Sequence, residues 1–141
     1  MRRVLAALLI GLTSVLAAGC DNGGDSTTTP TTPTTPLITE NFTGTVDPGG
    51  LSFNSFTIAN SGQVNVVLTA AGPPATIYMG LALGTFASGA CTLLSGASTL
   101  AQAGATAQLS GTANAGTYCV EVVDAGNQTA QISYAVTVTH Y

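Results

Sequence analysis

The sequence predicts an all-β domain over residues 37–141, an antiparallel β-sandwich of seven or eight strands. Three observations support this fold class. Apolar and polar side chains alternate with the period of two that β-strands show. Turn-forming sequences rich in Gly, Pro, Asn and Asp recur, as at 47–50, 60–62 and 124–127. Finally, no segment of the domain has the 3.6-residue periodicity of an amphipathic helix.

Each predicted strand is identified by apolar residues at every second position, because these side chains face one side of a sheet. In chain order the core-facing sets are Ile38, Phe42 and Val46; Leu51 and Phe53, then Phe56 and Ile58; Val64, Val66 and Leu68; Ile77, Met79, Leu81 and Leu83; Ala105, Ala107 and Leu109; Tyr118, Val120 and Val122; and Ile132, Tyr134, Val136 and Val138.

Two places interrupt this pattern. The apolar parity changes between Phe53 and Phe56, so the sequence predicts one extra residue near Asn54 and Ser55, which is a β-bulge. The segment 85–104 is rich in Ala, Ser, Gly and Thr, and no strand can be recognised in it with the same clarity.

Residues 1–19 are typical of an export signal. Arg2 and Arg3 precede an apolar stretch that is shorter than the ~20 residues needed to span a bilayer, and small residues follow it. The segment Leu16-Ala-Ala-Gly-Cys20 resembles a bacterial lipobox. The resemblance implies lipidation of Cys20 and attachment to a membrane of the bacterial cell envelope, at the outer membrane, the surface or the periplasmic side of the inner membrane. The alternative is a soluble secreted protein.

Residues 20–36 are predicted to be a disordered linker that begins with the lipidated cysteine. After Cys20 the segment is polar and repeats Thr-Thr-Pro, so it has no apolar side chains with which to build a core. In extended polyproline geometry it would reach at most about 50 Å.

The charge of the mature chain excludes several classes of function. The sequence has six acidic residues and two basic ones, Arg2 and Arg3, and both basic residues lie in the predicted export signal. Nucleic-acid binding depends on Lys and Arg, so no nucleic-acid partner is expected. Phosphoryl transfer is disfavoured because it needs a cationic clamp or clustered acids around a metal.

The remaining cysteines, Cys91 and Cys119, are predicted to form a disulfide, since an exported chain meets oxidising surroundings. Two unpaired thiols are the alternative. Cys119 has the parity of Glu121, which is expected to face solvent, so the bridge should hold the 85–104 segment on the outside of a sheet. With one distant histidine, these cysteines make a poor zinc site.

Other candidate chemistry is sparse, so neither catalytic residues nor a metal or cofactor are expected. His140 lies next to the C-terminal residue and is predicted to be solvated. Asp124 and Asn127 are predicted to hydrogen-bond their own turn rather than calcium.

Exposed aromatic side chains are the candidate ligand-binding residues. Tyr78 has the parity opposite to the core-facing side chains of its strand, and Phe86 and Tyr141 are also expected to be exposed. A polysaccharide-binding surface would use such aromatic platforms.

The domain resembles the bacterial pre-peptidase C-terminal domains. The resemblance covers most of residues 40–138 and rests on the segments 42–46, 56–58 and 62–66 and on Ala115-Gly-Thr-Tyr-Cys-Val-Glu-Val122. It implies a jelly-roll-like accessory module, of a kind that in some proteins binds calcium or polysaccharide. The segment 51–56 lacks the aspartate that is common in the family, so no acidic calcium site is expected there.

Together these observations predict a non-enzymatic, membrane-anchored envelope lipoprotein whose accessory β-sandwich binds a polysaccharide or a protein partner. The alternative is a structural component that self-assembles or adds a strand to another envelope protein. This alternative rests on the absence of Lys from the mature chain, because Lys commonly protects strand edges.

Overall fold

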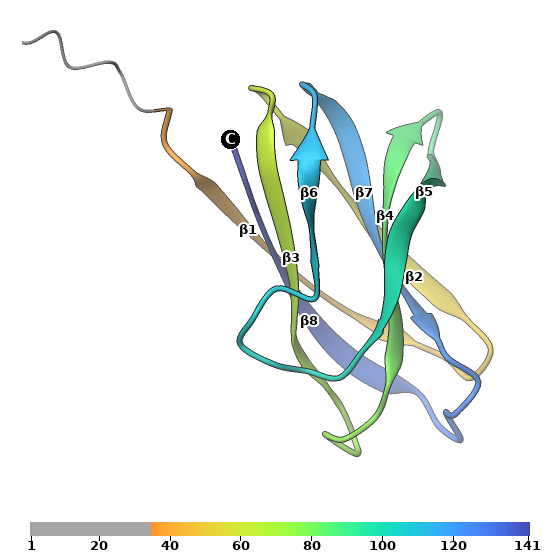
Figure 1. The fold of residues 1–141 in the computed structure, drawn as a ribbon. Helices are drawn as coiled ribbons and strands as arrows, with labels where there is room; N and C mark the ends of the chain where they lie inside the picture. Colours follow the sequence, from red (N-terminus) through yellow and green to blue (C-terminus); the bar gives the residue numbers. More distant parts are fainter. Residues whose placement is uncertain (1–34) are drawn as a thin grey trace, which may run out of the picture. The chain divides into compact units, whose positions relative to one another are not determined.

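The computed structural model describes residues 35–141, which form two antiparallel sheets packed face to face (Figure 1). Within these residues there are eight strands and no helix, so the predicted all-β sandwich is confirmed. None of the described residues belongs to a helix that could cross a membrane. The predicted export signal, Cys20 and the linker up to residue 34 lie outside the described part of the chain. The strands are β1 (Ile38–Val46), β2 (Leu51–Ile58), β3 (Gly62–Gly72), β4 (Met79–Ala87), β5 (Ala90–Ala101), β6 (Leu109–Ala113), β7 (Gly116–Asp124) and β8 (Ile132–His140).

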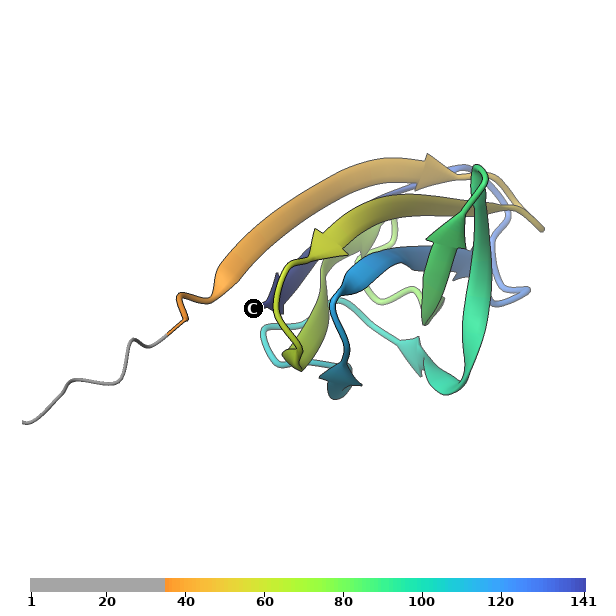
Figure 2. The ribbon, with the colours of Figure 1, turned by 90° about the horizontal axis from the view of Figure 1, so that it is seen from above.

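The strand order is that of a jelly roll. One sheet has the order β1-β8-β3-β6 and the other has the order β2-β7-β4-β5. The pairs β1–β8, β2–β7, β3–β6 and β4–β5 are antiparallel, as in one long hairpin rolled into two layers. Figure 2 shows these layers from above, with the β4–β5 hairpin turned steeply relative to the long strand β1. The free edge strands are β1 and β6 in the first sheet and β2 and β5 in the second.

The core lies between the sheets and consists of side chains from both inner faces. Because alternate residues of a strand point to opposite faces, most of the predicted core-facing sets are buried together. Within the described residues, the paired strands and the buried core cluster lie between residues 38 and 140. The larger core residues are Val46, Phe56, Ile58, Val64, Val66, Leu68, Ile77, Met79, Leu81, Val120, Val122, Ile132, Tyr134, Val136 and Val138.

The predicted β-bulge in the second strand is wrong, because β2 pairs with β7 without interruption over its whole length. Ser52 and Asn54 occupy the inner side of β2. The hydroxyl of the buried Tyr134 lies 2.8 Å from the Ser52 hydroxyl and accepts a hydrogen bond of 3.0 Å from the Asn54 amide. A buried hydroxyl needs such partners, so polar residues hold the inward positions. Leu51 and Phe53 therefore lie on the outer face.

The predicted strand at residues 105–109 is displaced toward the C-terminus. β6 begins at Leu109, while Ala105 and Ala107 precede it in a loop. Gln108 closes this loop, because its side-chain oxygen accepts a hydrogen bond of 2.7 Å from the backbone N–H of Leu68. A polar side chain, rather than alternating alanines, thus determines where the strand begins.

Candidate functional site

The predicted disulfide is confirmed. Cys91 on β5 and Cys119 on β7 are joined, with a Cα–Cα distance of 5.8 Å. Because β4 lies between β5 and β7 in the sheet, the bridge passes over β4 beside Gly84. A Cβ at Gly84 would lie 2.6 Å from the carbonyl oxygen of Thr92 and 2.9 Å from the Cys119 sulfur. Only glycine therefore allows β5 and the bridge to approach β4 so closely.

The predicted solvent exposure of Glu121 is wrong, and Cys119 on the same face is also buried. Both side chains lie on the outer face of the β2-β7-β4-β5 sheet, as their parity predicts, but both residues are buried. The reason is that β5 folds back over this face at Gly84 and is held there by the disulfide. Parity identified the face correctly, but the covering strand could not be recognised in the sequence.

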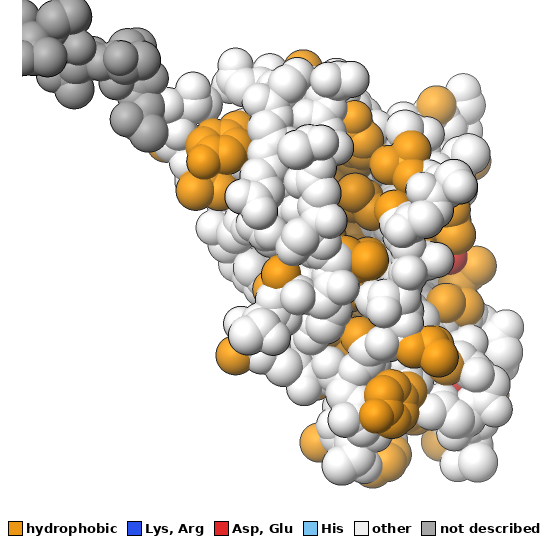
Figure 3. Space-filling model, in the orientation of Figure 1, with side chains coloured by type: hydrophobic (Ala, Val, Ile, Leu, Met, Phe, Trp, Pro, Cys, Tyr) orange, Lys and Arg blue, Asp and Glu red, His pale blue; other side chains and the backbone are white. Residues whose placement is uncertain are grey.

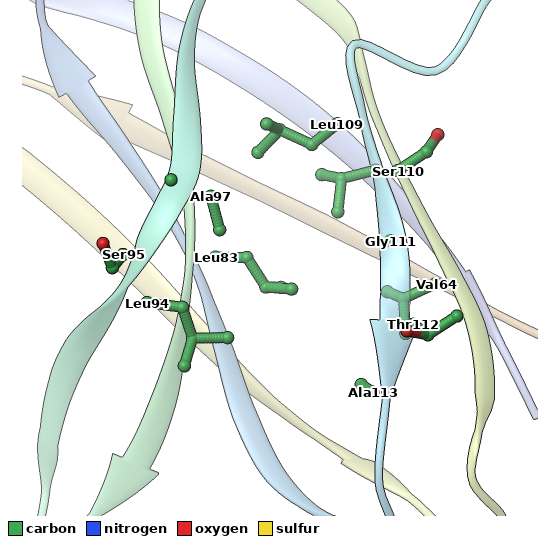
Figure 4. A pocket seen from close by; sticks show the side chains of 12 residues that line it. Val64, Leu83, Leu94, Ser95, Ala97, Leu109, Ser110, Gly111, Thr112 and Ala113 are labelled. Atoms are coloured by element: carbon green, nitrogen blue, oxygen red, sulfur yellow. The ribbon is translucent and has the colours of Figure 1, made fainter.

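A cleft opens between the edge strands β5 and β6, where the two sheets separate (Figures 3 and 4). It has a volume of about 370 Å³. Its floor consists of core side chains, and Leu94 and Leu109 project into it from opposite walls. No charged side chain lines this β5–β6 cleft, and in Figure 3 orange apolar groups fill the space between the two strands. The lining residues are Val64, Val66, Leu83, Leu94, Ser95, Gly96, Ala97, Leu109, Ser110, Gly111, Thr112 and Ala113.

A bulge in β5 supplies one wall of the cleft. The pairing of β5 with β4 shifts between Ser98 and Leu93, so residues 94–97 have no partner on β4. Gly96 in this bulge has a φ of 76°, in the left-handed region that favours glycine. β5 pairs only with β4, and β6 pairs only with β3, so each strand leaves one backbone edge unpaired at the cleft.

The structure places the three predicted aromatic residues on different elements. Tyr78, just before β4, is 49% exposed. The ring of Tyr141, after β8, lies against Gly62, where an added Cβ would meet it. The ring of Phe86 on β4 packs beside the ring of Phe53 on β2, with centroids 6.1 Å apart. Sequence reasoning missed Phe53, because the assumed bulge had assigned its side chain to the core.

The predicted solvation of His140 is wrong, since its exposed fraction is 0%. Its Nε2 atom lies 2.9 Å from a carboxylate oxygen of Glu40, and its ring centroid lies 5.4 Å from that of Phe56. His140 ends β8, which is an inner strand of its sheet, and Ile38 of β1 pairs with it. Pairing with β1 and burial against Phe56 therefore remove His140 from solvent.

Asp124 binds backbone groups, as predicted for a turn residue. Its Oδ1 accepts hydrogen bonds from the N–H groups of Gly126, Asn127 and Gln128, at 2.8, 3.2 and 3.2 Å. Its Oδ2 accepts a 2.7 Å hydrogen bond from the N–H of Gly49. The bond from Gly49 contributes most to lowering the pKa of Asp124, against a smaller opposing effect of burial. Across residues 35–141 no group of three or more His, Cys, Asp or Glu residues is arranged to hold a metal ion.

Comparisons with known proteins found neither a family model nor a curated protein that matches the chain. The fold, the β5–β6 cleft and the chemistry of individual side chains are therefore the basis for a functional proposal.

Proposed function

We propose that this chain is a non-enzymatic, membrane-anchored lipoprotein of the bacterial cell envelope, and that its β-sandwich binds a strand of a protein partner in the β5–β6 cleft. The anchor is inferred from the resemblance of Leu16–Cys20 to a lipobox. Binding is inferred from one observation, namely that two unpaired strand edges flank an apolar cleft.

The chemistry of the cleft favours an extended polypeptide. An added strand hydrogen-bonds to a free sheet edge, while its alternate side chains enter pockets beside that edge. Here the pocket is bordered by Leu94 and Leu109 and contains no charge. We therefore infer a segment with apolar side chains at alternate positions as the occupant.

The candidate catalytic groups are engaged elsewhere, which supports a non-enzymatic role. His140 is buried against Glu40 and Phe56, and Cys91 and Cys119 are oxidised to a disulfide. Hydroxyl groups in the cleft come from Ser and Thr alone, and its lining includes no base or carboxylate that would activate them.

Site-specific photo-crosslinking in living cells tests the occupancy of the cleft. A photoreactive amino acid replaces Leu94 on β5 or Thr112 on β6, both of which line the cleft. We expect both positions to give the same protein adduct, identified by mass spectrometry, since one strand would touch both walls. Thr57, exposed on β2 and outside the cleft, is the matched control. The absence of an adduct at both cleft positions, or identical adducts at Thr57, would contradict the proposal.

Metabolic labelling tests the anchor. A palmitate analogue should label the wild-type chain and fail to label Cys20→Ala, because lipidation needs the thiol. Two or more acyl chains hold a protein stably in a bilayer, so the variant should also leave the membrane fraction. Equal labelling of the variant would refute lipidation at Cys20.

The alternative to a partner protein is self-assembly through the same free edges of β5 and β6. A second copy of the chain could supply the added strand, because no Lys or Arg occurs after Arg3 to protect the edges. Light scattering on the purified mature chain distinguishes the two possibilities. A mass that rises with concentration supports self-assembly, whereas a strict monomer eliminates it.

Polysaccharide binding is a second candidate, favoured by the pair Phe53 and Phe86 on the outer face. Aromatic rings beside one another can stack on sugar rings. The resemblance to pre-peptidase C-terminal domains supports the same candidate. Retention on cell-wall polysaccharide that is lost in Phe53→Ala would support it, and no retention of the wild-type chain would remove it.

A further inference from the structure

A second hollow lies on the outer face of the β2-β7-β4-β5 sheet, apart from the β5–β6 cleft. It has a volume of about 310 Å³. Leu93 lines this hollow and the next residue, Leu94, lines the cleft, so β5 separates the two. We call it the Glu121 hollow, and its lining residues are Gly80, Leu81, Ala82, Leu93, Ser98, Thr99, Leu100, Glu121 and Val123.

The register of the sheet explains the shape of the hollow. On the outer face Glu121 of β7 lies beside Ala82 of β4, which pairs in turn with Ser98 of β5. Ala82 and the neighbouring Gly80 are small, so β4 forms a low floor between two higher walls. β5 is kept over this face because the disulfide joins it to Cys119, two residues before Glu121.

The carboxylate of Glu121 has no cationic partner within the described residues. The residue is 9% exposed, and the only ion pair in this part of the chain joins His140 to Glu40. Burial alone raises the pKa of Glu121, with no hydrogen bond acting against it. After Arg3 the sequence contains no Lys or Arg, so no side chain of the mature chain is a permanent cation. A partly dehydrated carboxylate therefore faces an apolar hollow without compensation.

The walls complement a cation that carries an apolar stem. Leu93 and Leu100 border the hollow from β5, and Leu100 is 66% exposed. Val123 borders it from β7. The site thus combines one unpaired anion with apolar surfaces.

We propose that the Glu121 hollow binds an organic cation, a primary ammonium group on an alkyl stem. The ammonium would donate charge-assisted hydrogen bonds to the Glu121 carboxylate, and the stem would lie against Leu93, Leu100 and Val123. A free alkylamine and a lysine side chain share this chemistry. The site does not depend on the occupant of the β5–β6 cleft.

An NMR titration of residues 21–141, which include the complete domain, tests the proposal. Butylammonium chloride is the probe, and butan-1-ol is the neutral probe of the same length. We expect saturable shifts of the amides of Ala82, Ser98 and Glu121 with butylammonium, with a Kd of about 1 mM, and no saturable shift with butan-1-ol. Equal binding of both probes, or no saturation by about 10 mM butylammonium, would overturn the proposal.

Two variants separate the site from general charge effects. Glu121→Gln keeps the size of the side chain and removes its charge, so we expect binding at least tenfold weaker. Asp47→Asn removes the same charge in the β1–β2 turn, away from the hollow, and should bind as the wild type does. Unchanged binding by a folded Glu121→Gln variant would also overturn the proposal.

A second probe identifies the source of the ammonium group. Nα-acetyl-lysine methylamide carries the same group on a peptide unit. Binding as tight as that of butylammonium supports recognition of a lysine side chain of a partner. Tenfold weaker binding supports a free amine instead.

Discussion

Gly84 is the residue on which the position of β5 depends. An added Cβ would collide with the backbone of Thr92 and the sulfur of Cys119, and neither is the flexible end of a long side chain. Because glycine has no Cβ, the disulfide can pass over β4 at this position. The glycine is thus required by packing, and nothing in its sequence neighbourhood distinguishes it from other glycines of the domain.

Gly84→Ala should destabilise the domain by about 1–3 kcal/mol, the usual cost of forcing extra volume into a packed site. The control is Gly111→Ala on β6, where nothing lies within 4 Å of an added Cβ. Urea unfolding of both variants measures the difference. Equal stability of Gly84→Ala and the wild type would show that β5 can move away from β4 without cost.

Glu121 provides a second prediction at this scale. Burial raises the pKa of its carboxyl group in the folded state, so ionisation opposes folding and stability falls as pH rises past the ordinary carboxyl pKa. Glu121→Gln should therefore be more stable than the wild type at pH 7. The difference should vanish below about pH 4, where the carboxyl is protonated in both states. Thermal unfolding across this range checks the sign, and a less stable variant at pH 7 would contradict it.

At the scale of elements, β5 is the least predictable strand, and it contributes four residues to each candidate site. Its residues are mostly Ala, Ser, Gly, Thr and Leu, and most of them are exposed at an edge, so no clear alternation marks the strand. The central strands β3 and β8 were recognised because buried and less buried side chains alternate along them, throughout β8 and as far as Leu68 in β3. The prediction for β2 failed because two inward positions are polar. Ser52 and Asn54 hydrogen-bond the hydroxyl of Tyr134 from the other sheet, which alternation of apolar residues cannot reveal.

Loss of the disulfide should act on β5 before the other strands. Cys91 and Cys119 are 28 residues apart in the sequence, and on the chain-entropy model closing such a loop contributes about 3.5 kcal/mol. The double variant Cys91→Ala, Cys119→Ala should lose about this much stability. Hydrogen exchange should show β5 amides opening well below the global unfolding energy. Uniform loss of protection across all strands would contradict a local role.

The carboxylate of Asp124 holds the loop that joins β7 to β8 through hydrogen bonds from the loop's backbone N–H groups. Its pKa is lowered mainly by the hydrogen bond from Gly49, so its contribution to stability is present above the ordinary Asp pKa and is lost as pH falls below about 4. Asp124→Asn should reduce the acid-induced loss of stability seen in the wild type. Identical acid unfolding curves for the two proteins would contradict this assignment.

At the scale of the whole molecule, alternation and turn sequences were sufficient to predict an antiparallel β-sandwich, and the resemblance to pre-peptidase C-terminal domains implied its jelly-roll type. The disulfide could also be predicted, since the prediction required only two cysteines and the expectation that the chain is exported. The β5–β6 cleft and the Glu121 hollow could not, because both depend on register between strands that are distant in sequence. Likewise, the burial of His140 follows from the position of β8 between β1 and β3, which local patterns do not encode.

The complete molecule, as we propose it, presents two unpaired strand edges at the end of a lipid-anchored linker. Hydrogen exchange measured on the protein in isolated cell envelopes and on the purified mature chain tests this account most directly. A bound strand should slow exchange at β5 residues 94–97 and along β6 at least tenfold in the envelope and leave β2 unchanged. Equal exchange rates of β5 and β6 in the two preparations would contradict the account.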